Sequence, residues 1–282
     1  MLTHENTGSW RTARRHAVIC LGLAWCAFVL VPAVLLPVAP VDAGTRGTVI
    51  GLVPVLAGCS YLLVLAVGEL TWPRPTGAVR RAALAPRGAA DVVPRGVRRA
   101  TWWLLGVLTA LLAVTSATAA PDGRSVFHRY SAVVTGTSGP YPGLFYAVPL
   151  LVGCLVVLLG GEVVLRLVAR RPGVSGTSVE ADLALRRASG TRALVGVQAT
   201  VLGTLSGVLT ITGSALHSLA RGGTEEHVAW LDALGTAAAV AGPLVLLAVL
   251  VVAVVLTGRG DLPRMPRDDV AAVRPDRGQA RA

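Results

Sequence analysis

The stretch that decides the fold is Gly139–Arg171, GPYPGLFYAVPLLVGCLVVLLGGEVVLRLVARR. It opens with a turn of glycine, proline and tyrosine and ends in a cluster of arginines. Between them lies an apolar run of about 20 residues, the length at which a helix spans the hydrocarbon core of a bilayer. The stretch therefore predicts one complete membrane crossing.

Similar apolar runs recur along the chain, and part of one has nearly the same sequence as this stretch. Leu52–Cys59 is LVPVLAGC, and Ala147–Cys154 is AVPLLVGC. We predict an all-α integral membrane helical bundle of six transmembrane helices within residues 17–257. A polar segment, 1–16, precedes it, and a charged tail, 258–282, is expected to be disordered. The six runs are 17–39, 48–70, 101–120, 144–168, 193–216 and 233–257.

The composition supports a membrane protein over a soluble one. The 282 residues are 53% hydrophobic and 15% charged, with a mean hydropathy of +0.64, whereas about a quarter of a typical soluble domain is charged. Arginines before the first run also suit a signal peptide, whose apolar core is about 7–15 residues long. Because the first run is longer than that, we predict an uncleaved helix.

All 26 basic residues are arginine. The absence of lysine excludes the lysine-dependent phosphate sites of P-loop and kinase enzymes and any Schiff-base lysine. Heavy arginine usage is typical of a GC-rich bacterial genome. The arginines lie in the connections between apolar runs and not on a folded basic face with aromatic residues, so no nucleic-acid partner is expected.

The distribution of arginine predicts the orientation in the membrane. Of the 26 arginines, 22 lie in the N-terminal segment, in the connections after the second and fourth runs, and in the tail. Because arginine is retained on the cytoplasmic side, we predict a bacterial cytoplasmic membrane protein with both termini in the cytoplasm. The other links hold Arg46, Arg124, Arg129 and Arg221.

The connections also carry local signals. Residues 73–100, rich in proline, glycine and arginine, are expected to form a loose loop near the lipid headgroups. Residues 177–187 predict a short soluble helix with a capping box of Thr177 and Glu180, ended by Gly190. Aromatic residues in 121–143 are expected to anchor that link at the outer interface.

Two patterns suggest three repeated helical hairpins. A proline lies in the outer half of each even-numbered run, and an arginine pair precedes each odd-numbered run. Such hairpins would be related by an axis along the membrane normal. The alternative is that so biased a composition produces both patterns by chance.

No motif for catalysis, for a metal or for a cofactor is present. The four cysteines, Cys20, Cys26, Cys59 and Cys154, all lie in apolar runs, which favours buried thiols over disulfides or metal ligands. We therefore expect no enzyme, and an intramembrane enzyme ranks third among the classes of function.

Ionisable residues within a crossing are functional candidates by default. Glu162 and Arg166, four residues apart, are expected either to pair at the cytoplasmic boundary or to form a proton or cation site. The fifth run is the most polar crossing, and Gln198, Thr200 and Thr204 either line a solute path or bond within the bundle. Its small residues predict close helix packing at Gly196, Gly203 and Gly207.

Two classes of function remain from the sequence. The first is a structural or accessory membrane subunit, which contacts membrane lipid and a protein partner in the membrane. The second is a small permease or transporter component, in which the fifth run and the proline-containing even-numbered helices form the path.

Overall fold

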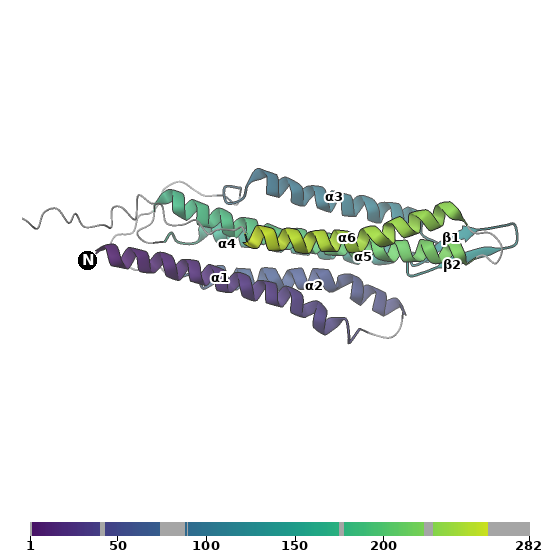
Figure 1. The fold of residues 1–282 in the computed structure, drawn as a ribbon, viewed down its shortest axis with the longest axis horizontal. Coiled ribbons are helices and arrows are strands. Elements are labelled where there is room, and N and C mark those ends of the chain that lie inside the picture. The colour runs from purple at the N-terminus through teal and green to yellow at the C-terminus, as the bar shows by residue number, and fades with distance from the viewer. Residues whose placement is uncertain are drawn as a thin grey trace, which may run out of the picture.

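The computed structural model describes residues 2–39, 43–73, 88, 90–174, 178–222 and 228–258. Six long helices run up and down in an elongated bundle, with a two-stranded ribbon at one end (Figure 1). The elements are α1 Leu2–Leu35, α2 Ala43–Leu70, α3 Arg95–Thr118, β1 Val126–Arg129, β2 Thr135–Ser138, α4 Leu144–Arg170, α5 Val179–Arg221 and α6 Ala229–Gly258.

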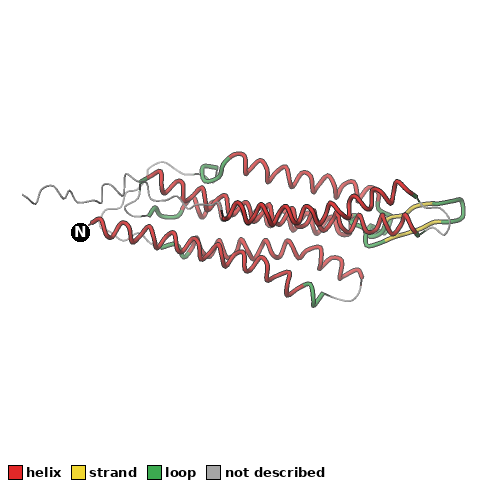
Figure 2. Tube along the Cα trace, in the orientation of Figure 1, coloured by secondary structure: helices red, strands yellow, loops and turns green. Residues whose placement is uncertain are grey.

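All six helices are long and apolar enough to cross a membrane, which confirms the predicted all-α membrane bundle. We call the end with β1 and β2 the ribbon end. The opposite end, where α1, α3 and α5 begin and where α2 and α4 finish, is the arginine-rich end (Figures 1 and 2).

Helix α5 is the centre of the bundle, as its stripe of small residues predicts. In its most apolar stretch 61% of the residues are buried, against 11% in α1 and 17% in α6. Helix α6 packs closely on it, because the Ser206 hydroxyl donates to the Gly242 carbonyl at 2.7 Å and a Cβ at Gly213 would collide with the backbone of Ala239. The outward faces of α1 and α6 are left for lipid.

The prediction of a separate soluble helix ended by Gly190 is wrong. Helix α5 runs unbroken for 43 residues, from Val179 to Arg221. Its cap is Ser178, whose hydroxyl accepts from the backbone N–H of Ala181 at 3.3 Å, whereas Thr177 lies outside the described residues. A Cβ at Gly190 would lie only 2.5 Å from the carbonyl oxygen of Val92, so this glycine permits close contact between segments and does not end the helix.

The segment before α3 is also more ordered than the sequence suggests. Residues 74–87 and 89 lie outside the described part, but Val92 and Val93 are buried against the core, and α3 begins at Arg95. Helix α1 includes most of the polar N-terminal segment and ends at Leu35, before Pro37. The tail from residue 259 lies outside the described residues.

A β-ribbon closes the link between α3 and α4, which the sequence did not predict. Strands β1 and β2 pair antiparallel, with Val126 opposite Ser138. The ribbon is fastened to α5, because the Tyr130 hydroxyl donates to the carbonyl of Leu219.

The three successive helix pairs are not equivalent. Helices α1 and α2, and likewise α5 and α6, pack extensively on each other, whereas α3 makes more contact with α5 than with α4. The repeat therefore stays a hypothesis about origin, and the packing does not reproduce it.

Candidate functional site

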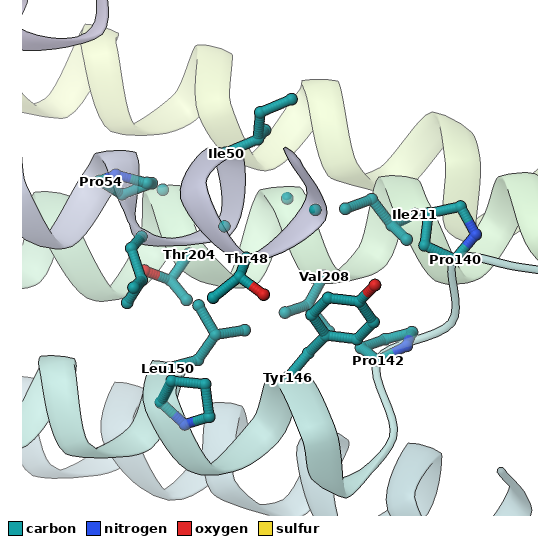
Figure 3. Close-up of a pocket in the computed structure, with 16 residues that line it drawn as sticks. Thr48, Ile50, Pro54, Pro140, Pro142, Tyr146, Leu150, Thr204, Val208 and Ile211 are labelled. Atoms are coloured by element: carbon teal, nitrogen blue, oxygen red, sulfur yellow. The ribbon is translucent and has the colours of Figure 1, made fainter. Parts of the chain in front are cut away.

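A cavity of about 70 Å³ lies between α2, α4 and α5 towards the ribbon end (Figure 3). The turn before α4, with Pro140 and Pro142, lies over one side of it. Its lining is apolar apart from two threonine hydroxyls and one tyrosine hydroxyl. The lining residues are Gly47, Thr48, Ile50, Gly51, Leu52, Pro54, Pro140, Pro142, Tyr146, Pro149, Leu150, Gly203, Thr204, Gly207, Val208 and Ile211.

Two glycines of α5 create much of this space. A Cβ added at Gly203 would lie 3.4 Å from the Cβ of Pro54, an ordinary contact, and one added at Gly207 would meet no heavy atom of the described residues within 4 Å. The close helix contact predicted at Gly207 is therefore absent from the described structure, and both residues border a cavity instead.

The turn over the cavity is held by α3 and by the loop before β1. The backbone N–H of Tyr141 donates to the carbonyl of Arg124 at 2.7 Å, and the Thr115 hydroxyl donates to the carbonyl of Pro142 at 2.7 Å. The Tyr141 and Thr118 hydroxyls are also 2.7 Å apart. These bonds fix the prolines of the turn at the cavity, and the Gly139–Pro140 peptide bond is cis.

Tyr146 brings a third hydroxyl group to the cavity wall, on a residue that is 8% exposed. Its hydroxyl lies against α2, since a Cβ at Gly47 would be 3.0 Å from that oxygen. The hydroxyl makes no hydrogen bond within the part of the chain that the structure describes. Thr204 differs, because its hydroxyl donates to the carbonyl of Thr200 at 3.0 Å.

The cavity is closed towards the arginine-rich end. Next to the cavity on that side, Gly58 of α2 is in contact with the side chain of Thr200 of α5. A Cβ at Gly153 of α4 would lie 2.9 Å from the side chain of Val55 of α2. Farther along, the fully buried Tyr61 fills the space between α2 and α5 and donates to the carbonyl of Arg192 at 3.0 Å. The space is therefore a blind pocket.

The other predicted residues of α5 do not face this cavity as a group. Thr200 lies below it and donates to the carbonyl of Gly196 at 3.0 Å. Gln198 points to α3, where its amide donates to the carbonyl of Val97 and to the hydroxyl of Thr101, both at 3.0 Å. Gly196 is the packing position that the stripe predicts, because a Cβ there would collide with the ring of Tyr61.

The expected ion pair within α4 is replaced by one between helices. Glu162 Oε1 lies 2.6 Å from a guanidinium nitrogen of Arg98 on α3, and Arg166 is exposed on the surface of α4. The i, i+4 spacing that predicts a pair of Glu162 with Arg166 cannot predict Arg98, because Arg98 is 64 positions away in the sequence. The structure thus assigns Glu162 to the contact between α3 and α4.

A buried ionic cluster at the arginine-rich end was not predicted. One guanidinium nitrogen of Arg171 lies 3.1 Å from Glu69, while the guanidinium carbon is 3.9 Å from the centre of the Trp72 ring. Burial lowers the pKa of Arg171, and the carboxylate of Glu69 opposes that shift, so the residue stays charged at neutral pH. Nearby, Arg186 pairs with Asp182 at 2.8 Å.

The described histidine near the end of α5 and the four cysteines lie apart from one another. His217 lies near the ribbon end, 2.7 Å from Asp232 of α6. The four cysteines are free thiols, and only Cys154 is fully buried while Cys26 is exposed on α1. Within the described ranges no cluster of histidine, cysteine and acidic side chains has the arrangement of a metal site.

Comparison of this chain with protein-family models, with curated proteins and with solved structures finds no match.

Proposed function

We propose that this multi-pass membrane protein is a structural or accessory subunit of a bacterial cytoplasmic membrane assembly. In this role it binds a protein partner in the bilayer and does not itself catalyse a reaction or conduct a solute. The observation that supports the proposal most is the closure of the bundle below the cavity, where Gly58 meets Thr200 and Tyr61 fills the core.

The polar side chains of α5 support the same role. The hydroxyls of Thr200, Thr204 and Thr210 donate to carbonyls one turn earlier in their own helix, at 2.9–3.0 Å. Such bonding satisfies a hydroxyl inside a membrane helix without presenting it to a solute. A continuous polar path along α5 is thus not supported by these contacts.

In the proposed orientation the arginine-rich end faces the cytoplasm. Its arginine-rich connections would there meet anionic lipid headgroups or an acidic protein surface. A partner in the membrane would cover part of the exposed apolar faces of α1, α3 or α6.

A small permease is the second candidate, favoured by the cavity that enters the bundle from the ribbon end. The lining is nevertheless apolar, and it suits the binding of an apolar molecule better than the passage of a polar one.

The test compares assembly with transport. The chain is extracted from its native membranes in mild detergent, its complexes are sized, and the purified chain is then reconstituted in sealed vesicles. We expect a complex of fixed composition with another membrane protein, larger than the 29.0 kDa chain, and vesicles that take up no more solute than empty ones. Saturable uptake by the purified chain, reduced by Thr204→Val, would instead establish the permease, and extraction as a single chain or self-oligomer would contradict the accessory role.

A further inference from the structure

We propose that the cavity between α2, α4 and α5 holds one acyl chain of a phospholipid from the leaflet at the ribbon end, with the polar part of the lipid beside Tyr146. This inference is independent of the protein partner proposed above, because it concerns the interior of the bundle (Figure 3).

The chemistry of the lining selects an apolar occupant. None of the lining residues is charged, and the Thr204 hydroxyl is already bonded to its own helix. A water molecule is stable in a cavity only with about 2–4 polar partners, and apolar cavities instead take apolar ligands. In a bilayer the apolar molecules that surround this position are acyl chains.

The shape of the cavity selects a linear occupant. Its wall extends from Gly47 to Pro54 on α2 and from Gly203 to Ile211 on α5, which corresponds to about 10–12 Å along the helix axes at roughly 1.5 Å per residue. A space that extends along α2 and α5 over this length lies in the same direction as the lipid chains. A space of about 70 Å³ along these helices is small enough to take part of one extended acyl chain.

Gly207 is a second sign that the space is used. A glycine inside a helix costs about 1 kcal/mol relative to alanine. At Gly190 and Gly213 the close approach of another segment explains the residue, but at Gly207 the described structure offers a Cβ open space. A chain lying in the cavity would supply the contact that this glycine permits.

The upper end of the cavity provides groups for the polar part of the lipid. The Tyr146 hydroxyl makes no hydrogen bond to another described residue and is not one of their enclosed, unpartnered polar atoms. It can therefore donate to a molecule that lies in the cavity. Phe145 precedes Tyr146 on the first turn of α4. The guanidinium of Arg124, in the loop before β1, lies 4.0 Å from the centre of the Phe145 ring. A hydroxyl donor at the cavity, with a cation on the ring of the preceding residue, suits the ester and phosphate oxygens of a phospholipid more than a free hydrocarbon.

The test uses photolabelling in vesicles of phosphatidylethanolamine and phosphatidylglycerol. One probe is a phospholipid with a diazirine in the middle of an acyl chain, and the other is a free alkane with the same diazirine. Labelled peptides are identified by mass spectrometry. We expect the phospholipid probe to label the α4 and α5 segments that line the cavity, and to do so more strongly than the alkane.

The variant Gly207→Leu places a side chain in the cavity at a position where a Cβ meets no described atom within 4 Å. It should reduce this labelling roughly tenfold, equivalent to about 1.4 kcal/mol. The matched control is Gly106→Leu, at a helical glycine of α3 where a Cβ also meets no described atom, and it should label like the wild type. Tyr146→Phe should reduce labelling by the phospholipid but not by the alkane. Should Gly207→Leu fail to fold, Ile211→Phe fills the same space.

Three results would overturn the proposal. The first is unchanged labelling in cavity-filled variants that keep the wild-type unfolding temperature. The second is equal labelling by both probes with no effect of Tyr146→Phe, which would indicate a site for free apolar solutes. The third is capture of the cavity residues by another protein chain, or by a second copy of this one.

Discussion

At the scale of single residues, Arg186 of α5 fastens the end of α4. Its guanidinium donates to the carbonyls of Val168, Ala169 and Arg171 at 2.7–3.0 Å, and to Asp182. The last carbonyls of a helix have no partner in their own helix, so a fully buried arginine replaces water as their donor. The side chain is thus a brace between two crossings.

Replacing Arg186 with methionine should lower the free energy of unfolding by about 3–5 kcal/mol, because it leaves Asp182 as a buried charge without this partner. Thermal unfolding in mild detergent measures the change. The matched control is Arg187→Met, at the exposed neighbouring position, and it should differ little from the wild type. Equal unfolding temperatures for the two variants would contradict the bracing role.

Glu69 and Glu162 each form an ion pair with an arginine from another part of the chain. Replacing each with glutamine should lower the free energy of unfolding by different amounts. The Arg171 side chain is 1% exposed, so Glu69→Gln leaves a buried cation and should cost about 3–5 kcal/mol. The Arg98–Glu162 pair is partly exposed, with 36% of the Arg98 side chain and 21% of the Glu162 side chain accessible. Glu162→Gln should therefore lower the free energy of unfolding by about 1 kcal/mol or less. Matched chemical unfolding curves provide the comparison, and a larger loss for Glu162→Gln would refute it.

The partner of Glu162 shows which part of an ion pair can be predicted from sequence. The sequence identifies Glu162 as a paired residue but gives Arg166 as its partner, whereas the structure pairs it with Arg98. Spacing within one helix finds Arg166, since i and i+4 lie on one face. Arg98 is 64 positions away, and only the docking of α3 on α4 brings it there. The cluster of Glu69 and Arg171 depends in the same way on three-dimensional packing.

At the scale of elements, α5 shows that one residue type has several uses in a single helix. Gly190 and Gly213 admit neighbouring backbone, Gly196 admits the ring of Tyr61, and Gly203 and Gly207 border the cavity. The sequence shows only that small residues recur. Which of them are in close contact depends on the register of α2 and α6 against α5.

Alanine substitutions at Gly190 and Gly207 should therefore change the free energy of unfolding in opposite directions. Gly190→Ala forces a methyl group against the Val92 carbonyl at 2.5 Å and should destabilise the protein by about 1–3 kcal/mol. In detergent without phospholipid, Gly207→Ala adds a methyl group where no described atom lies within 4 Å and should stabilise the helix by about 0.5–1 kcal/mol. Unfolding temperatures of both variants check the signs, and destabilisation by Gly207→Ala comparable to that by Gly190→Ala would show that the stripe is packed throughout.

The helices were predictable because each crossing is a long apolar run, and length and composition suffice to recognise one. The ribbon was not, because β1 and β2 are each only four residues long and carry no strong alternation. The cavity itself was not predicted, because the sequence assigns Gly203 and Gly207 to close helix packing and Thr204 to a solute path or to bonding within the bundle. Gly203, Thr204 and Gly207 stand out on α5, but Tyr146, Pro140 and Pro142 join them only through the turn before α4.

At the scale of the whole molecule, α5 is longer than one membrane crossing requires, and its first turns belong to the arginine-rich end. At about 1.5 Å per residue, the 43 residues of α5 extend about 64 Å, roughly twice the thickness of a hydrocarbon core of about 30 Å. The first turns of α5 pack there with the start of α1 and with Trp72, in a cluster of Trp10, Ala13, Trp72, Ala181 and Leu185. This end is thus a folded region where a partner or lipid headgroups would be met.

The most direct test of the account is a map of which ends of the crossings face the cytoplasm. Reporter fusions at Gly88, at Gly176 and at the C-terminus should be active as cytoplasmic proteins, and fusions at Gly136 and Gly223 as external ones. Gly88 and Gly136 lie at opposite ends of the described bundle, whereas the other three positions are outside the described residues. The account predicts this strict alternation, since six crossings place all arginine-rich connections on one side. A single connection found on the opposite side would contradict the arrangement of six crossings and the proposed orientation together.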